Sequence, residues 1–333
     1  MFDRAENVPP DRLHAVTVAI CGLACRIRST NADMLALYLR RIAWTPLPPE
    51  TVPACRIDLI FARDLGWPSW EWTEDGWAMH IYDQIVTDAG YHAAYPYFPR
   101  QWIVGEADTG RALYLLDDVG DLPAWDSGSP FRIPLHWIFS ARKGCLMHSA
   151  SLGIDGHGIL LAGPGGSGKS GTTLAGLAHG LSTVGDDYVM VDLNEGPFAS
   201  RVYRMVKQDA AGVARIPGLG ARLGERRTNW QGKFEFDPDG LFPGAVRDRM
   251  RLHGILLPSR GGGDRSALEP VSRPGAVRLL SEAMSGEAPA QKVEALLFVV
   301  ALTLHLPTYR MRLSTDPAEI ASTVRSFIEA RLQ

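Results

Sequence analysis

The residues with the clearest chemical potential form a glycine-rich octet at positions 163–170, with the sequence GPGGSGKS. The octet matches the phosphate-binding pattern G-x-x-x-x-G-K-[ST] at each fixed position. Its glycines allow successive backbone N–H groups to approach phosphate oxygens without interference from a Cβ atom. The Lys169 ammonium can neutralise the β- and γ-phosphates, and the Ser170 hydroxyl can bind Mg²⁺. The predicted cofactor-binding residues are Gly163, Gly165, Gly166, Ser167, Gly168, Lys169, Ser170 and Gly171.

The segments beside the octet have the character that this motif requires. The apolar run at 159–162 predicts a buried strand that leads into the loop, and residues 169–180 predict a helix that begins at its end. A helix N-terminus carries a partial positive charge, so it adds to the attraction for phosphate. The order strand, loop, helix therefore predicts a nucleoside triphosphate site.

Three further side chains are candidates for chemistry at this site. Residues 182–193 predict a strand that carries the adjacent carboxylates Asp186 and Asp187 near its middle. If that strand neighbours the strand before the loop, one carboxylate can deprotonate an attacking hydroxyl while the other holds the metal. Residues 145–154 predict a strand with His148, joined by a tight turn at 155–158 to the strand before the loop. Paired aspartates also occur in solvated turns, and a lone histidine also occurs in protein cores. Both a catalytic and a structural role therefore stay open for these side chains.

Length and composition limit the class of protein. The chain of 333 residues has room for two domains, and its 46% hydrophobic content supports sizeable cores. A net charge of −3 argues against a nucleic acid partner. The N-terminus lacks the apolar region of a signal peptide, and no apolar run reaches the length of a membrane span. We therefore expect a cytoplasmic protein without a membrane partner, in which Cys21, Cys25, Cys55 and Cys145 are reduced and buried.

A Pro/Ser/Gly-rich stretch at 122–130 predicts a domain boundary, with an N-terminal α+β domain over 1–125 and a nucleotide-binding domain over 126–333. The first domain is expected to be rich in strands, with two short strands around Gly22, a helix at 31–41, and a hairpin from 102–107 to 111–117. A second hairpin is predicted at 67–77, where Trp70, Trp72 and Trp77 form either a core or a peptide-binding face. In the second domain, the basic region 201–227 is expected to be partly mobile.

The sequence MHSA at 147–150, the octet and the pair Asp186–Asp187 resemble, in order and spacing, the kinase domain of the HPr kinase/phosphorylase family. The resemblance covers residues 144–193. It implies an α/β fold with a P-loop kinase core of the HPr kinase and phosphoenolpyruvate carboxykinase type, with ATP and Mg²⁺ as cofactors. The implied activity is transfer of the γ-phosphoryl group to a serine hydroxyl of a small protein.

By position, the same resemblance implies a role for each candidate side chain. Asp186 corresponds to the catalytic base, Asp187 to its neighbour near Mg²⁺ together with Ser170, and His148 to a residue that supports the Asp186 site. Lys169 takes the usual role of the loop lysine. The resemblance also implies assembly as a homo-oligomer.

Two signatures of the family are incomplete in this chain. The sequence RIPGLG at 215–220 lacks the acidic residue that precedes it in the family, for which Glu225 is the candidate replacement. A later Pro-Gly-Arg-Asn element is reduced to Pro274–Gly275, with Arg273 and Arg278 as candidate phosphate contacts.

The sequence GDDY at 185–188 is similar to divergent HPr-kinase-like proteins that phosphorylate a serine of a lasso-peptide precursor. This similarity implies a peptide or small protein as the substrate. Two alternatives remain open: a kinase of free serine or another small hydroxyl compound, and a non-catalytic nucleotide-binding regulator in which the aspartates serve only Mg²⁺. The N-terminal domain is expected to recognise the peptide, form an interface or support the core.

Overall fold

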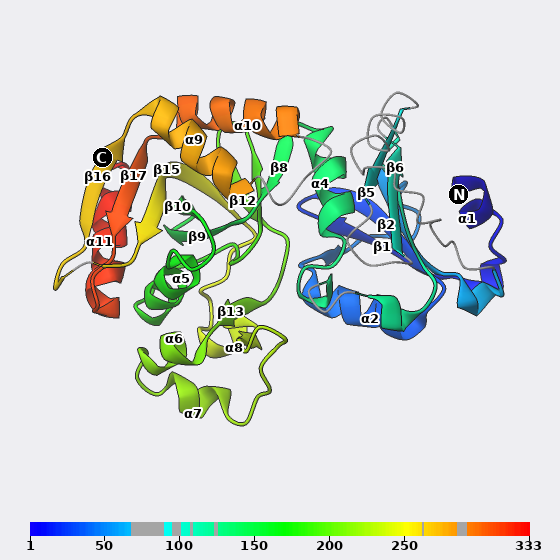
Figure 1. Cartoon of the computed structure of the whole chain (residues 1–333), viewed down its shortest axis with the longest axis horizontal. Coiled ribbons are helices and arrows are strands. Elements are labelled where there is room, and N and C mark those ends of the chain that lie inside the picture. The colour runs from blue at the N-terminus through cyan, green and yellow to red at the C-terminus, as the bar shows by residue number, and fades with distance from the viewer. Residues whose placement is uncertain (68–89, 95–100, 107–108, 123–125, 262, 285–291) are drawn as a thin grey trace, which may run out of the picture. The chain divides into compact units, whose positions relative to one another are not determined.

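A computed structural model describes residues 1–67, 90–94, 101–106, 109–122, 126–261, 263–284 and 292–333 (Figure 1). The fold is mixed α/β with several sheets, and it divides into two compact units. The first unit comprises Met1–Arg142 and the second begins at Lys143. The predicted tryptophan hairpin at 67–77 lies almost wholly outside the described residues. Among the helices that the structure describes, none has both the length and the apolar composition of a membrane span.

The first unit is built on a sheet with the strand order β3-β1-β2-β4-β7-β6-β5. The strands β2, β4 and β7 are parallel, and the other neighbours are antiparallel. Its strands are β1 His14–Ile20, β2 Leu23–Ser29, β3 Thr45–Pro46, β4 Cys55–Phe61, β5 Tyr91–Ala94, β6 Gln101–Glu106 and β7 Arg111–Leu116, and its α-helices are α1 Phe2–Glu6, α2 Ala32–Arg41 and α4 Arg132–Ser140.

Local sequence explains the elements that were predicted correctly in this unit. The turn between β1 and β2 places Cys21 and Gly22 at φ +49° and +78°, a left-handed pair typical of a tight hairpin. The predicted helix begins where the Asn31 Oδ1 accepts a hydrogen bond from the Met34 N–H at 3.0 Å. The hairpin of β6 and β7 is also confirmed.

Residues 126–142 belong to the first unit, whereas the composition of 122–130 predicted that they begin the second domain. The reason is packing: α4 lies against β6 and β7. Asp126 is buried and accepts hydrogen bonds from Tyr38 of α2 and, at 2.6 Å, from Tyr114 of β7. A buried carboxyl with two phenol donors ties residues 126–142 to the first sheet.

In the second unit, the described residues form a sheet of eight strands in which β16-β17-β15-β12-β11-β8 lie in order, while β10 pairs with both β15 and β9. A separate pair, β13 and β14, lies outside it. The strands are β8 Gly144–Met147, β9 Ser149–Ile154, β10 His157–Ala162, β11 Val189–Asp192, β12 Phe198–Arg201, β13 Val206–Gln208, β14 Phe234–Phe236, β15 Arg249–Ser259, β16 Ala267–Val271 and β17 Thr308–Arg312. The helices are α5 Lys169–Ala178, α6 Ala210–Ala214, α7 Leu219–Leu223, α8 Pro238–Leu241, α9 Arg273–Met284, α10 Lys292–His305 and α11 Pro317–Glu329.

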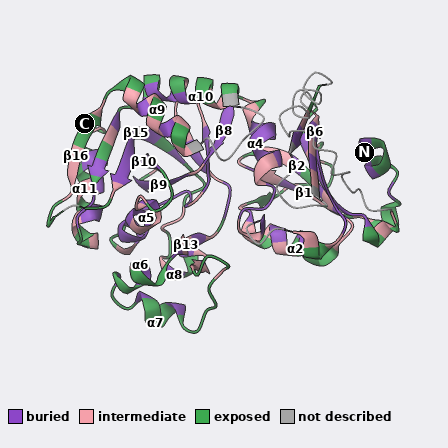
Figure 2. Cartoon of the chain, in the orientation of Figure 1, coloured by how far each residue is buried: buried purple, intermediate pink, exposed green. Residues whose placement is uncertain are grey.

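Helices cover both faces of β10, which explains its unbroken apolar sequence. Ile159 and Leu161 pack with the side chains of α11, whereas Leu160 packs in a second cluster with those of α9 and α10. Figure 2 shows the resulting pattern, with buried strands between helices whose outer faces are exposed. The predicted buried strand before the octet is therefore confirmed.

The basic region 201–227 is more regular than expected. It contributes β13, α6 and α7, which pack with β14, α8 and Leu174 of α5 around one small core. The buried members of that core are Leu174, Val206, Val213, Ile216, Leu219, Leu223, Phe236 and Leu241.

The loop between β10 and α5 depends on glycines at specific positions. Gly163, Gly166 and Gly168 have φ values of +138°, +77° and +115°. Residues other than glycine rarely adopt such backbone angles. A Cβ atom on Gly168 would lie 2.5 Å from the Cδ1 of Leu313, whereas one on Gly165 would meet nothing within 4 Å. Gly168 therefore allows the start of α5 to approach the end of β17.

We predict that Gly168→Ala lowers the free energy of unfolding by about 1–3 kcal/mol, because the new methyl group overlaps Leu313 and the backbone is strained. The matched variant Gly165→Ala is expected to change it by less than about 0.5 kcal/mol. Urea denaturation followed by circular dichroism measures both. An equal loss of unfolding free energy in the two variants would show that the contact with Leu313 does not determine the conformation of the loop.

Candidate functional site

The strand directions bring the glycine-rich loop and the aspartate pair to one edge of the sheet. The strand β9 is antiparallel to β10, with Ser151 opposite Leu160. Ser182 in turn forms an antiparallel bridge with Gly153 of β9. Residues 182–185 therefore run in the same direction as β10, with β9 between them, and Asp186 follows at the edge where the loop begins.

The two predicted strands around the site are each interrupted at the candidate side chains. The predicted strand 145–154 is split at His148 into β8 and β9, and of 182–193 only the end forms a regular strand, β11. The register explains this arrangement: Val189 lies opposite Met147, so the break at 186–188 lies across from the break at His148. The aspartates thus precede β11 and do not lie in the middle of a strand. Nor does β11 neighbour β10, since it pairs with β8 and β12.

Buried hydroxyl groups hold the segment before the aspartates on β9. The Ser151 Oγ accepts from the Val184 N–H at 3.0 Å, and the Thr183 hydroxyl donates to the Ser151 carbonyl at 2.8 Å. The Ser151 N–H donates to the Gly185 carbonyl at 3.1 Å. At Asp187 the backbone has φ +78°, which costs a non-glycine residue about 1–2 kcal/mol. Departures of this kind from regular strand geometry are frequent beside functional sites.

Asp186 is a buried carboxyl with one unpaired oxygen. Its side chain is only 1% exposed, and its Oδ2 accepts from the Lys207 N–H at 3.3 Å. Within the described part of the chain, its Oδ1 has no hydrogen-bond partner. Burial, and next the charge of Asp187, raise the pKa of Asp186 to about 6, although the Lys207 amide, Ser170 and Lys169 act in the other direction.

The pKa of Asp187 is displaced in the opposite direction. Its Oδ1 lies 3.3 Å from the Nε2 of His148, and its Oδ2 accepts from the Nζ of Lys207 at 2.7 Å. Burial acts to raise its pKa, but the contacts with His148 and Lys207 together hold the pKa well below its usual range. The His148 ring also stacks on Tyr188, with the ring centroids 5.1 Å apart. Two adjacent carboxyls therefore have pKa values displaced in opposite directions, a pattern found where one is kept charged and the other exchanges protons.

Lys207 is the site residue that sequence reasoning missed. It contacts both carboxyls, Asp187 through its ammonium and Asp186 through its backbone N–H. Pairing of β13 with β14 and the burial of Val206 fix its position. In the sequence, Lys207 is one of several basic residues in 201–227, and no motif distinguishes it from them.

The loop residues lie where the motif predicts. Gly163, Gly165, Gly166, Ser167 and Gly168 connect β10 to α5, and Lys169, Ser170 and Gly171 form the first turn of α5. The Lys169 Nζ donates to the carbonyls of Gly163 at 2.6 Å and Pro164 at 3.3 Å. Among the described residues, the buried Ser167 Oγ has no hydrogen-bond partner.

Other candidates from the sequence make contacts elsewhere. Arg273 donates to the Thr303 carbonyl, and Arg278 pairs with Glu282 on the exposed surface of α9. Glu225 is exposed just beyond α7. The residues that the structure describes include no group of three or more histidine, cysteine or acidic side chains placed to hold a metal. Ser170 and Lys169 of the loop act on the carboxyl of Asp186, and Asp187 follows it in the chain. A hydroxyl and two carboxyls are hard oxygen donors of the kind that Mg²⁺ binds.

No family model matches the chain, and no curated protein matches it. The solved structure of the Hpr(Ser) kinase/phosphatase from Coxiella burnetii is similar to it at 17% sequence identity, over 56% of this chain and 99% of that chain, with a TM-score of 0.30. We therefore base the functional proposal on the residues of this chain.

The raised pKa of Asp186 predicts that its ionisation opposes folding. The folded state retains the proton up to about pH 6, whereas an ordinary aspartate loses it near 3.8, so stability is lost as pH rises through this window. At 1.36 kcal/mol per pH unit the cost is about 3 kcal/mol. We expect Asp186→Asn to gain stability relative to the native chain by up to this amount between pH 4 and pH 7.5, measured by urea denaturation at both pH values. An equal difference at both would contradict the buried, late-titrating carboxyl.

Proposed function

We propose that this chain is an ATP-dependent phosphotransferase that transfers the γ-phosphoryl group to a serine hydroxyl of a peptide or small protein. The observation that carries the proposal is Asp186, a buried carboxyl with a pKa of about 6 and an unpaired oxygen, beside Ser170 at the end of the glycine-rich loop. A carboxyl with this pKa is ionised at neutral pH, yet is a stronger base than an exposed aspartate.

The loop and its helix supply the binding site for the phosphates. Backbone N–H groups of 165–168 and the N-terminus of α5 attract anionic oxygens, and Lys169 adds a positive charge. Ser170 and Asp187 are the side chains that would hold Mg²⁺, and Asp187 suits this role because its low pKa keeps it ionised. Mg²⁺, when bound, neutralises charge on the β- and γ-phosphates.

The two carboxyls divide the remaining work. Asp186 accepts the proton of the attacking hydroxyl, so the oxygen becomes a better nucleophile. Its bond to the γ-phosphorus forms as the bond between that phosphorus and the bridging oxygen breaks, and ADP leaves. In the metal-free protein, burial and next the negative charge of Asp187 raise the pKa of Asp186. His148 and Lys207 are positioning residues, because both act through Asp187.

The serine acceptor, including the serine of a lasso-peptide precursor, comes from the resemblance of the sequence to HPr-kinase-like proteins. On this proposal the protein is cytoplasmic, assembles as a homo-oligomer and uses its N-terminal domain to recognise the peptide. The alternatives are a kinase of free serine or another small hydroxyl compound, and a nucleotide-binding regulator without an acceptor.

We predict that the full chain transfers label from γ-labelled ATP to serine-containing peptides and not to the same peptides with alanine in place of serine. Asp186→Asn is expected to lower the rate by at least about 100-fold, because it removes the general base. It is expected to retain ATP binding, measured by calorimetry. The matched control Asp192→Asn removes a carboxyl of β11 that pairs with Arg249.

The outcomes separate the alternatives. Labelling of free serine but not of peptides would favour the small-molecule kinase, and ATP binding without transfer to any acceptor would favour the regulator. Activity of Asp186→Asn close to that of the native chain would remove Asp186 from the role of base.

The pH dependence of the rate provides a separate prediction. We expect kcat/KM to rise with pH through about 6, because protonated Asp186 cannot accept the proton of the hydroxyl. In Asp187→Asn the rise is expected at a lower pH, since the charge that raises the pKa of Asp186 is gone. The position of the rise, and not the size of the rate, is the measurement. An unchanged position would show that the two carboxyls are not coupled.

A further inference from the structure

A row of arginines crosses the sheet of the first unit. The register of the parallel strands places Arg26 of β2 opposite Arg56 of β4, and Arg56 opposite Arg111 of β7. Residues directly opposite each other project from the same face, and so does Arg28, two positions after Arg26. Like charges in such positions repel each other. This arrangement therefore requires negative charge on the same face.

The chain supplies part of that charge through Asp58, which is fully buried. The Asp58 carboxylate accepts from the Nε and Nη2 of Arg28 at 2.6 and 2.8 Å, and it also lies 3.2 Å from the Nε of Arg56. This forked contact has the geometry in which guanidinium binds carboxylate best. Asp58 is therefore a structural partner of Arg28 and Arg56.

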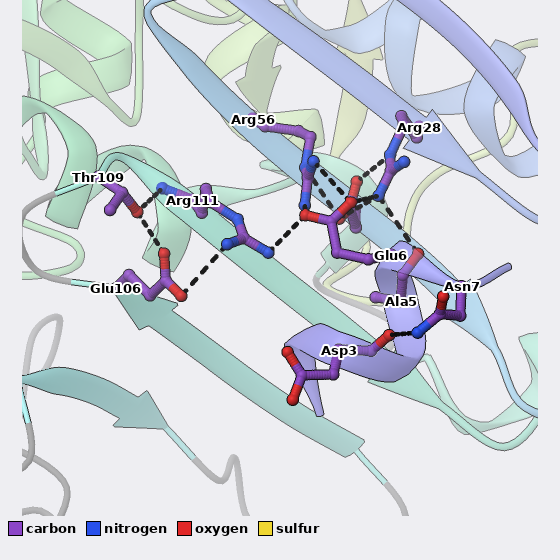
Figure 3. A network of polar contacts seen from close by, with 10 residues as sticks. Asp3, Ala5, Glu6, Asn7, Arg28, Arg56, Glu106, Thr109 and Arg111 are labelled. Carbon is purple, nitrogen blue, oxygen red and sulfur yellow. Dashed lines mark hydrogen bonds and ion pairs between the residues drawn. The ribbon is translucent and has the colours of Figure 1, made fainter.

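Glu6 supplies a second carboxylate, which is exposed to solvent, whereas that of Asp58 is buried. Figure 3 shows its side chain directed at the arginines, where its Oε1 accepts from the Nη2 of Arg56 at 2.6 Å and from the Nη2 of Arg111 at 2.7 Å. Glu6 belongs to the five-residue helix α1, and 42% of its side chain is exposed. Phe2 and Ala5 anchor this helix in the core, but the Glu6 carboxylate itself faces solvent. It is therefore exchangeable, in contrast to that of Asp58.

The four arginines also line a cavity of about 340 Å³, together with Thr109. Arg26 is exposed, and within the described part of the chain it contacts no carboxylate. Arg56 and Arg111 each have a second carboxylate partner besides Glu6, namely Asp58 at 3.2 Å and Glu106 at 3.4 Å. The cavity thus presents one guanidinium without a counter-charge and two for which one of the two carboxylate partners, Glu6, is exchangeable.

We propose that this arginine row is a binding site for the carboxylates of an acidic peptide, and that Glu6 occupies one carboxylate position from within the chain. The resident group is itself a glutamate side chain, so the site already accepts this chemistry. Neighbouring strands lie about 4.8 Å apart, so the row suits a linear ligand with more than one carboxylate. Arginine forks bind such groups in preference to uncharged amides. This binding site does not depend on the phosphotransferase proposal.

The test uses fluorescein-labelled tetraglutamate and tetraglutamine peptides with the full chain, followed by fluorescence anisotropy at low ionic strength. We expect saturable binding of tetraglutamate only. Arg26→Gln is expected to weaken it about tenfold, because one charge-assisted contact is lost. Glu6→Gln is expected to strengthen it, because Arg56 and Arg111 each lose one of their two carboxylate partners. The two variants therefore change affinity in opposite directions, which a merely structural network would not produce.

Arg40→Gln is the matched control, since it removes an exposed arginine from α2, elsewhere in the first unit. Weakening by Arg40→Gln equal to that by Arg26→Gln would reduce the effect to net charge and overturn the site. Unchanged or weaker binding by Glu6→Gln, with the fold intact by circular dichroism, would overturn the exchange of Glu6. Displacement of tetraglutamate by inorganic phosphate at lower concentrations than by acetate would overturn the assignment to carboxylates.

Discussion

Asp186 and Asp187 lie next to each other in the chain in a largely buried setting, and this juxtaposition of like charges governs the surroundings of the site. A buried carboxylate pair is unfavourable unless cations and donors compensate it or one member keeps its proton. The chain uses both means. Lys207 and His148 face Asp187 and stabilise its charge, while Asp186 has a raised pKa and retains an unpaired oxygen.

The sheet creates the space for this pair by interrupting two strands at the same level. A continuous strand through 145–154 or 182–193 would engage its backbone groups in the ladder and alternate its side chains between the two faces. The breaks at His148 and at 186–188 remove those constraints where they lie across from each other. The regular strands on either side then hold the irregular segment in place, and β13 brings Lys207 to it.

In the first unit, the neighbouring like charges are arginines, and nearby carboxylates compensate them. There the parallel register sets arginines side by side, and carboxylates from β4 and α1 compensate them. Asp58 is a buried part of the sheet, whereas Glu6 extends from a short helix with its carboxylate exposed to solvent. In both units, charged side chains of the same sign lie side by side and not all of them are fully compensated. Asp186 has an oxygen without a hydrogen-bond partner, and Arg26 has no carboxylate partner among the described residues. Such groups are suited to binding or chemistry.

The sequence by itself determined the elements whose signals are local. The octet, the apolar strand before it, and the helix at 31–41 follow from residues close together in the chain, so their types and spacing were sufficient. The role of Lys207 and the unpaired oxygen of Asp186 depended on tertiary structure, because they arise from segments separated by many residues. The sequence also did not predict where the two strands around the site are interrupted, since apolar residues continue on both sides of each interruption. Periodicity reports which side chains are buried, but only the pairing of distant strands decides where a ladder stops.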